Sequence, residues 1–408
     1  MPIPKSVAVP VSTAGQWLYR QAGPVYNYAM REGLGRVFPP AAPNRRPDVD
    51  RAVRIVGLLS TATGIGQSAR LCVDELARAG YVIETRNLSS LFRIDNGLAY
   101  PHSAPTPRKP ATTIFHFNPP LIMLAMIASG VRRYYRGFNI AYWAWELPEL
   151  PPEWIVALRY VDAILVPSAF CRDIVRRHTT KPVLVVPHPV TVGFPDLAPR
   201  APTGDRPFRV LNAFNCRSSL YRKNPFGAID AFRAAFGTDR GAELVIKVSD
   251  GAQHQADIAL LRGHIAGQSN IRLVDELMPP EQLHALLCTA DAYVSLHRSE
   301  GFGLTIAETI LHEVPVVVTG WSGNLDYCSP DLAWLVDYRI VPVADPHPAY
   351  SSLTGSSWAE PSIDHAATHL VAIRNDPSTA RARAQRLRQH LIDHIATNSY
   401  AAALASLR

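Results

Sequence analysis

The chain has 408 residues, of which 47% are hydrophobic and 18% are charged, a length and composition that indicate a globular protein large enough for two domains. The 41 Lys and Arg exceed the 34 Asp and Glu and give a formal net charge of +7, which favours polyanionic partners such as nucleotide phosphates or an acidic membrane surface. No stretch reaches the roughly 18 apolar residues of a membrane helix, and the first residues lack the features of a signal peptide. We therefore expect a cytoplasmic protein, with peripheral association at the inner face of the cytoplasmic membrane as an option.

The cysteines are scattered and form no CxxC pair, so the sequence suggests neither a zinc site nor a disulfide framework. They are Cys72, Cys171, Cys216, Cys288 and Cys328.

The first predicted elements form a series of short apolar strands that alternate with helix-like segments. Residues 1–50 precede this series as a Pro- and Arg-rich extension. Near-continuous apolar strands separated by helices indicate a parallel sheet covered on both faces. The predicted strands are 53–59, 82–87, 112–117, 139–145, 163–168 and 183–188.

A Pro-rich loop near residues 190–207 interrupts the pattern, and a second series of the same kind follows it. The predicted fold class is therefore α/β, with two doubly wound Rossmann-like domains at 51–195 and 205–377 that face each other across a cleft. A basic helical segment, 378–408, either closes the second domain or crosses back to the first. The second series comprises 209–215, 243–249, 271–276, 292–297, 315–320 and 333–338.

The stretch HRSEGFGLTIAETI places two glutamates around a Gly-Phe-Gly turn directly after a predicted strand. Glu300 lies in the loop, and Glu308 lies in a helix that is predicted to begin near Leu304 or Thr305. The free N–H groups of a helix start bind phosphate, and the glycines allow close approach. Carboxylates suit paired sugar hydroxyls, so the stretch is consistent with a nucleotide-sugar clamp. The alternative is that both glutamates are solvated surface charges. The candidate donor ligands here are Gly301, Phe302, Gly303, Leu304, Thr305 and Glu308.

Basic residues follow the first strand of the second predicted domain. Arg222 and Lys223, in SSLYRKNP, could neutralise a diphosphate leaving group, although an isolated basic pair is more often surface charge. Lys247, near the end of the next strand, is a third candidate cation. The loop TGWSGNLDY follows a later strand, and its Asn324 either frames the sugar or belongs to a turn.

In the first predicted domain, polar and aromatic residues also follow strands. STATGIGQSAR is a Gly-containing turn in which Gly64 and Gly66 either approach a phosphate or only shape a tight turn. His116 ends a strand, where its imidazole could contact the sugar or be structural. Trp145 and Glu146 are candidates for acceptor binding, with core packing as the alternative for the indole.

Several familiar motifs are missing from the chain. No HExxH, acidic DxD-like loop pair, P-loop lysine or GxSxG is present, so we expect no metal and no cofactor apart from the co-substrate. No nucleic-acid partner is expected either.

Together these motifs resemble glycosyltransferase family 4, whose members are retaining enzymes with the GT-B fold. The resemblance rests on Glu300 to Glu308, which matches the family's Glu-(seven residues)-Glu motif, on Arg222-Lys223 and on the double Rossmann pattern over roughly 53–375. It implies retaining, metal-independent hexose transfer from a nucleoside-diphosphate sugar. The first domain would bind the acceptor and the second the donor.

The resemblance also implies roles for single residues. Glu300 would hold the sugar hydroxyls, Glu308 the ribose, and Arg222 with Lys223 the diphosphate. The acceptor would be a glycan or a lipid-linked sugar. The alternatives are a sugar epimerase or phosphorylase, or a non-catalytic sugar-nucleotide-binding scaffold in a polysaccharide assembly complex.

Overall fold

The computed structural model of the chain describes most of the sequence from residue 51 onward. The predicted 1–50 extension lies almost entirely outside the described residues. The described residues are 40, 41, 45, 47, 51–92, 94–100, 111–119, 121–191, 206–276, 278–347, 350, 353 and 355–408.

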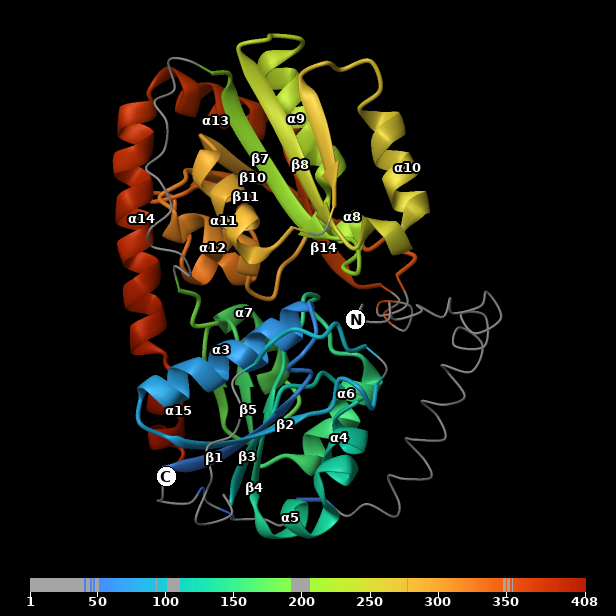
Figure 1. Cartoon of the computed structure of the whole chain (residues 1–408), viewed down its shortest axis with the longest axis vertical. Coiled ribbons are helices and arrows are strands. Elements are labelled where there is room, and N and C mark those ends of the chain that lie inside the picture. Colours follow the sequence, from blue (N-terminus) through green and yellow to red (C-terminus); the bar gives the residue numbers. More distant parts are fainter. Residues whose placement is uncertain are drawn as a thin grey trace, which may run out of the picture.

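The N-terminal domain is built on a parallel sheet of six strands within the described residues, in the order β2-β1-β3-β4-β5-β6 (Figure 1). The central strands are rich in Val, Ile, Leu and aromatic residues and are buried on both faces, whereas the edge strand Val82–Asn87 is partly exposed. The strands are β1 (Ala52–Gly57), β2 (Val82–Asn87), β3 (Thr112–Phe115), β4 (Phe138–Tyr142), β5 (Ala163–Val166) and β6 (Val183–Val185). The helices are α3 (Gly64–Arg78), α4 (Ile122–Ser129), α5 (Val131–Arg136), α6 (Pro152–Ala157) and α7 (Ala169–Arg176), with a 3₁₀ turn η2 (Leu158–Tyr160).

The C-terminal domain repeats this architecture with a second parallel sheet, in the order β12-β11-β10-β7-β8-β9. Its strands are β7 (Phe208–Asn215), β8 (Ala242–Ser249), β9 (Ile271–Asp275), β10 (Ala292–Ser295), β11 (Val316–Thr319) and β12 (Trp334–Val336). Its helices are α8 (Leu220–Lys223), α9 (Pro225–Phe236), α10 (Gln255–His264), α11 (Pro280–Thr289), α12 (Leu304–Leu311) and α13 (Ile363–Asn375), with 3₁₀ turns η4 (Gly251–Gln253) and η5 (Gly323–Asp326).

Two parallel-sheet α/β domains confirm the predicted fold class. Each predicted strand is present with small shifts of its ends. Two strands were not predicted, β13 (Tyr338–Pro342) and β14 (Ser357–Pro361), and they pair with each other in antiparallel fashion. Trp358 of β14 and Tyr350 pack into the core of the N-terminal domain, so this segment joins the two domains.

The C-terminal helices run along both domains (Figure 1). α14 (Pro377–Thr397) begins with Asp376 as its N-cap and Pro377 at its first position, which is a favourable start for a helix. α14 packs on α12 of the second domain, whereas α15 (Tyr400–Ser406) packs on α3 of the first. Tyr400 is fully buried in the N-terminal core. Among the described residues, no helix is long and apolar enough to cross a membrane.

In each sheet the chain adds strands first to one side and then to the other. The order reverses between the neighbouring strands β1 and β3 in the first sheet, and between β7 and β10 in the second. The loops that leave the carboxyl ends of such strands diverge and open a crevice, which is where ligands bind in parallel α/β sheets. The turn before α3 and the loops after β7 and β10 therefore mark the expected binding region.

Candidate active site

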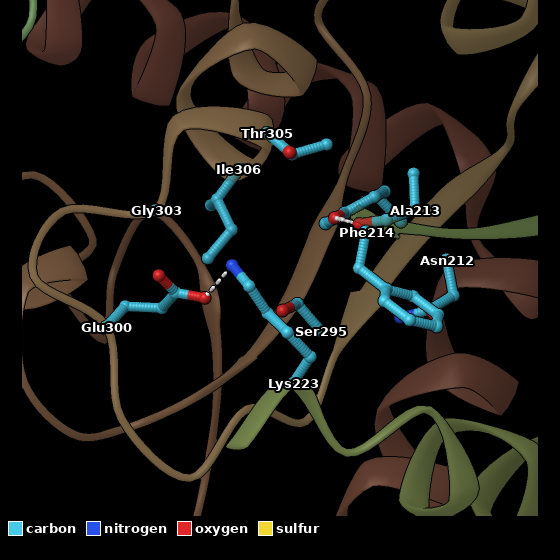
Figure 2. A pocket seen from close by; sticks show the side chains of 10 residues that line it. Asn212, Ala213, Phe214, Lys223, Ser295, Glu300, Gly303, Thr305 and Ile306 are labelled. Atoms are coloured by element: carbon cyan, nitrogen blue, oxygen red, sulfur yellow. Dashed lines mark hydrogen bonds and ion pairs between the residues drawn. The ribbon is translucent and has the colours of Figure 1, made fainter. Parts of the chain in front are cut away.

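A pocket lies in the second sheet at the carboxyl ends of the neighbouring strands β7 and β10, where the loops that follow them diverge (Figure 2). Its walls come from the end of β7, from β10 and from the start of α12, and Lys223 points into it toward Glu300. The lining residues are Asn212, Ala213, Phe214, Lys223, Tyr293, Ser295, Glu300, Gly303, Thr305 and Ile306.

Glu300 lies at this pocket between two cations. Lys223 Nζ donates to Glu300 Oε1, and Arg222 Nη1 lies 3.2 Å from Glu300 Oε2. Burial alone would raise the pKa of the Glu300 carboxyl, but Lys223 and Arg222 outweigh it and lower that pKa to about 2. Glu300 is therefore ionised at neutral pH and acts as a hydrogen-bond acceptor.

Arg222 is held by a short helix that the sequence specifies locally. Ser219 caps α8 by accepting a hydrogen bond from the Arg222 backbone N–H at 3.0 Å. The Arg222 side chain is 4% exposed, and its Nη1 also donates to the Ser299 carbonyl at 2.8 Å. Burial lowers the pKa of Arg222, but the combined effect of Tyr350, Glu300 and Glu146 is larger and raises it. The pKa therefore lies above its usual value, and the guanidinium stays charged.

Lys223 ends the same helix and is less buried than Arg222. Its side chain is 20% exposed. Burial lowers the pKa of Lys223 against the opposing effect of Glu300. The next residue, Asn224, has a left-handed backbone with φ of 50° and donates to the Leu296 carbonyl at 2.8 Å, which fixes α8 to the end of β10.

The start of α12 forms the opposite wall of the pocket. Gly303 precedes the helix with φ of +87°, a conformation that favours glycine, and no side chain caps the helix. The N–H groups of the first turn have no carbonyl partner inside the helix. Thr305 of this turn lines the pocket. The pocket thus combines a helix N-terminus with Lys223, two features that favour bound phosphate.

Glu308 lies one turn further along α12 and contacts the other domain. Gln67 of α3 donates from Nε2 to Glu308 Oε1 at 2.5 Å. Burial raises the pKa of Glu308 to about 7, and the Gln67 hydrogen bond partly offsets this rise. Gln67 was not singled out from the sequence, although its place directly after Gly66 in the predicted turn was a signal.

The glycine turn of the N-terminal domain faces α12. A Cβ on Gly64 would lie 3.6 Å from Leu304 Cδ1, so the starts of α3 and α12 approach each other. Neither Gly64 nor Gly66 has a positive φ. Gly66 is needed for packing instead, because a Cβ there would lie 2.3 Å from Thr61 Oγ1 and 2.6 Å from the Leu58 carbonyl oxygen.

The loop that carries Glu300 touches the N-terminal domain directly. A Cβ on Gly301 would lie 2.9 Å from the Trp145 carbonyl oxygen. Ser168 Oγ donates to the Gly301 carbonyl at 2.7 Å, and the Ala169 N–H donates to Asp326 Oδ2 at 2.7 Å. The two domains are therefore closed on each other at the candidate site.

Glu146 of the N-terminal domain lies beside the charged cluster. Its Oε1 is 3.6 Å from Arg222 Nη2, and its carbonyl accepts from Ser299 Oγ. This position next to the Arg222 and Glu300 pair is compatible with the predicted role in acceptor binding.

His116 follows β3 directly, and its side chain has the structural surroundings that the sequence left as the alternative. Its imidazole is fully buried, stacks on Tyr142 at 4.9 Å and lies 3.3 Å from Ser68 Oγ through Nδ1. Burial lowers its pKa to about 3, so the ring is neutral. The side chain packs against α3 through Ser68 and against α15 through Tyr400, which is the structural alternative for His116.

Other predicted ligands also have structural surroundings. Lys247 is 2% exposed, and its ammonium donates to the carbonyls of Val248 and Glu276 at 2.7 and 2.6 Å, so it does not reach the pocket. The Trp145 indole is buried against Trp154 and donates to the Glu149 carbonyl at 2.7 Å, which is the core-packing alternative.

Phe302 and Asn324 support the Glu300 loop from behind. The Phe302 ring is 3% exposed and packs on Tyr327 with centroids 5.1 Å apart. Asn324 is fully buried and donates to the Thr319 carbonyl at 3.0 Å. Neither side chain lines the pocket, so both are in positions that support the loop and do not face a donor bound there.

One protein-family model matches the C-terminal part of the chain. A model described as "Family 4 Glycosyltransferase in conflict systems" matches residues 169–404. A search of curated proteins gives no match.

Several solved structures share this fold. HepE of Anabaena, in complex with UDP and glucose, has a TM-score of 0.60 and 11% identity over 87% of this chain and 99% of its own. A glycosyltransferase of Rickettsia africae has a TM-score of 0.59 and 12% identity, covering 88% and 97%. The pneumococcal O-GlcNAc transferase GtfA, with UDP and GlcNAc, has a TM-score of 0.50 and 14% identity.

The match to GtfA covers 72% of this chain and 56% of GtfA, so this chain spans about half the length of that protein. At these identities the solved structures establish the fold alone, and that fold is GT-B. The family model covers more than half of the 408 residues. The chain therefore belongs to the family 4 glycosyltransferases of conflict systems.

Proposed function

We propose that this glycosyltransferase moves a hexose from a nucleoside-diphosphate sugar to a hydroxyl acceptor, with retention of anomeric configuration and without a metal ion. The observation that carries the proposal is the pocket in which Lys223, Glu300 and the start of α12 converge. Each of the three matches one part of a sugar diphosphate.

The diphosphate would lie against the start of α12 and the paired cations. The first-turn N–H groups of α12 donate to phosphate oxygens, and Gly303 leaves room for them. Lys223 and Arg222 are both within ion-pair reach of Glu300, and Arg222 also lies beside Glu146, so two cations meet two carboxylates here. The ammonium and guanidinium groups would stabilise the negative charge that builds up on the leaving diphosphate, which is the role a metal ion would otherwise have.

The sugar would lie against Glu300. A carboxylate whose pKa is about 2 does not donate a proton at neutral pH, and two cations reduce its nucleophilicity. Glu300 is therefore better suited to accept hydrogen bonds from hexose hydroxyls than to act as an acid or a nucleophile. Retention enters the proposal through the resemblance of Glu300 to Glu308 to the motif of retaining GT-B enzymes.

The donor and acceptor follow from chemistry and from related folds. HepE and GtfA have been observed with UDP, so uridine diphosphate sugars are the first donors to test. Glu146 at the mouth of the charged cluster supports a hydroxyl acceptor, which we take to be a glycan or a lipid-linked sugar. Peripheral association with an acidic membrane face would fit the net charge of +7.

The test is release of nucleoside diphosphate from a panel of sugar nucleotides, with crude membrane glycolipid as acceptor and with and without EDTA. Glu300→Ala and Arg222→Ala should each lower release by roughly 100-fold or more. Matched controls are Glu281→Ala and Arg262→Ala, which alter exposed residues of α11 and α10. Release that survives both site substitutions would refute the site. Binding without release for every donor would favour a scaffold.

A further inference from the structure

Gln67 connects the two domains at the position proposed for the nucleotide ribose. It lies in the first turns of α3, and its backbone N–H donates to the Thr63 carbonyl at 2.9 Å. From there its side chain spans the domain interface, and Nε2 reaches Glu308 Oε1 at 2.5 Å. The hydrogen bond joins residues that are 241 positions apart in the chain.

The glycines before Gln67 bring the start of α3 close to α12. Gly66, directly before it, packs without a Cβ against Thr61 and Leu58. Gly64 lies opposite Leu304, so α3 and α12 begin side by side. Gln67 therefore begins α3 close enough to α12 for its amide to reach Glu308.

Glu308 keeps free hydrogen-bonding capacity after this contact. A carboxylate offers about four acceptor positions, and Gln67 occupies one of them. Among the residues that the structure describes, Gln67 Nε2 is the single hydrogen-bond donor recorded for Glu308. The second oxygen, Oε2, is thus available for hydroxyl groups. Its direction is set by the hydrogen bond that Gln67 donates to Oε1.

We propose that Gln67 is a positioning residue of the ribose subsite. Its amide holds one oxygen of Glu308, so that the other accepts the hydroxyl hydrogens of the ribose. This inference rests on the proposed function, because it takes the ligand to be a nucleoside diphosphate. It follows that the ribose subsite is complete only when the N-terminal domain is closed on the C-terminal domain.

The experiment is isothermal titration of the full chain with UDP, 2′-deoxy-UDP and 3′-deoxy-UDP, with GDP and ADP in parallel. The variants are Gln67→Met, Glu308→Gln and the double variant. A hydrogen bond between a ribose hydroxyl and the charged Glu308 corresponds to roughly a 10- to 100-fold change in affinity, and this bond is lost when the carboxylate is no longer held in place. Gln67→Met should weaken UDP binding by at least the lower value and reduce the preference for UDP over its deoxy analogues.

The chain supplies a matched control for the lost hydrogen bond. Gln385 Nε2 donates to Glu313 Oε2 at 3.1 Å on the exposed side of α14. Gln385→Met removes the same type of contact far from the pocket and should leave UDP affinity unchanged. The double variant Gln67→Met with Glu308→Gln should bind UDP no more weakly than Glu308→Gln alone, because both changes act on one contact.

A pH profile separates positioning from simple packing. The Gln67 N–H favours the ionised form of Glu308, so its loss should move the midpoint of the pH dependence of UDP binding upward. If Gln67→Met does not fold, Gln67→Asn keeps an amide but shortens its reach, and it should shift affinity and midpoint in the same direction.

The outcomes distinguish this inference from the proposed function. UDP affinity within twofold of wild type in a folded Gln67 variant, with an unmoved midpoint, would overturn the role of Gln67 and leave the nucleotide site intact. Wild-type protein that binds none of UDP, GDP and ADP would overturn the proposed function, and the role of Gln67 with it.

Discussion

Replacing Glu300 by Gln should destabilise the folded protein by about 3 kcal/mol at neutral pH. The structure lowers the pKa of Glu300 from 4.5 to about 2. Because each tenfold change in proton affinity corresponds to about 1.4 kcal/mol, this shift adds about 3 kcal/mol to the free energy of unfolding at neutral pH. Glutamine has nearly the shape of the neutral carboxyl group, so Glu300→Gln removes the charge and little else. Arg222, which is 4% exposed, would then lose its nearest buried counter-charge.

The assay is urea unfolding of wild type and Glu300→Gln, followed by circular dichroism. A group whose pKa is lowered by folding adds stability above its unfolded pKa, and this stability is lost as the pH falls through the folded value. The difference between the two proteins should therefore be full above pH 4.5 and shrink steadily toward pH 2.

Ligand binding and an exposed control substitution test the same charge balance. UDP should stabilise Glu300→Gln by more than it stabilises wild type, because the diphosphate supplies the missing negative charge beside Arg222 and Lys223. Glu281→Gln, an exposed change on α11, should alter the free energy of unfolding by less than about 0.5 kcal/mol. A loss below 1 kcal/mol for Glu300→Gln that does not depend on pH would refute the charge balance assigned to this site.

Three other changes test separate parts of the structure. Because folding raises the pKa of Glu308 to about 7, wild type should lose stability relative to Glu308→Gln as the pH rises from 4.5 to 7, and parallel unfolding curves over that window would contradict the assignment. Gly301→Ala places a Cβ 2.9 Å from the Trp145 carbonyl oxygen and should lower kcat/KM at least tenfold. Gly263→Ala, whose Cβ would meet nothing within 4 Å, should leave kcat/KM unchanged. Equal kinetics for both variants would argue against domain closure. Tyr400→Ala should cost about 3 kcal/mol in urea unfolding, since the ring is fully buried against the N-terminal domain, and a cost below 1 kcal/mol would show that α15 contributes little to that core.

The closed arrangement of the domains gives the site its chemistry. Lys223, Arg222 and Glu300 all belong to the C-terminal domain, yet Arg222 also faces Glu146 from the other domain. Glu308 likewise meets Gln67. The C-terminal domain alone would therefore present Arg222 and Glu308 without their partners Glu146 and Gln67.

Much of the fold followed from local patterns. The strands were predictable because each is a short β-branched or aromatic run, and runs such as Val82–Asn87 were bounded correctly to the residue. β13 and β14 were missed because Tyr338–Pro342 is exposed at most positions and carries no continuous apolar run. Their pairing depends on contacts with the N-terminal core, which no local pattern reports.

The candidate site divides in the same way. The positions of Glu300, Glu308, Arg222 and Lys223 could be predicted because spacing along one loop or one helix turn decides where they lie. His116 could not, because the end of a strand determines neither which face a side chain takes nor what packs over it, and here Tyr142 and Tyr400 enclose it. Lys247 was misassigned for the same reason, since carbonyls from two separate segments hold its ammonium.

The sequence by itself determined the two-domain α/β architecture and the charged motifs after β7 and β10, because strand periodicity, glycine turns and helix starts are local properties of the chain. Only the tertiary structure decided which of those residues meet. The hold of Gln67 on Glu308, the burial of Arg222 beside Glu300 and the shielding of His116 depend on packing between segments up to hundreds of residues apart. Burial and opposing charges set pKa values through distance in space, and the sequence alone does not contain those distances.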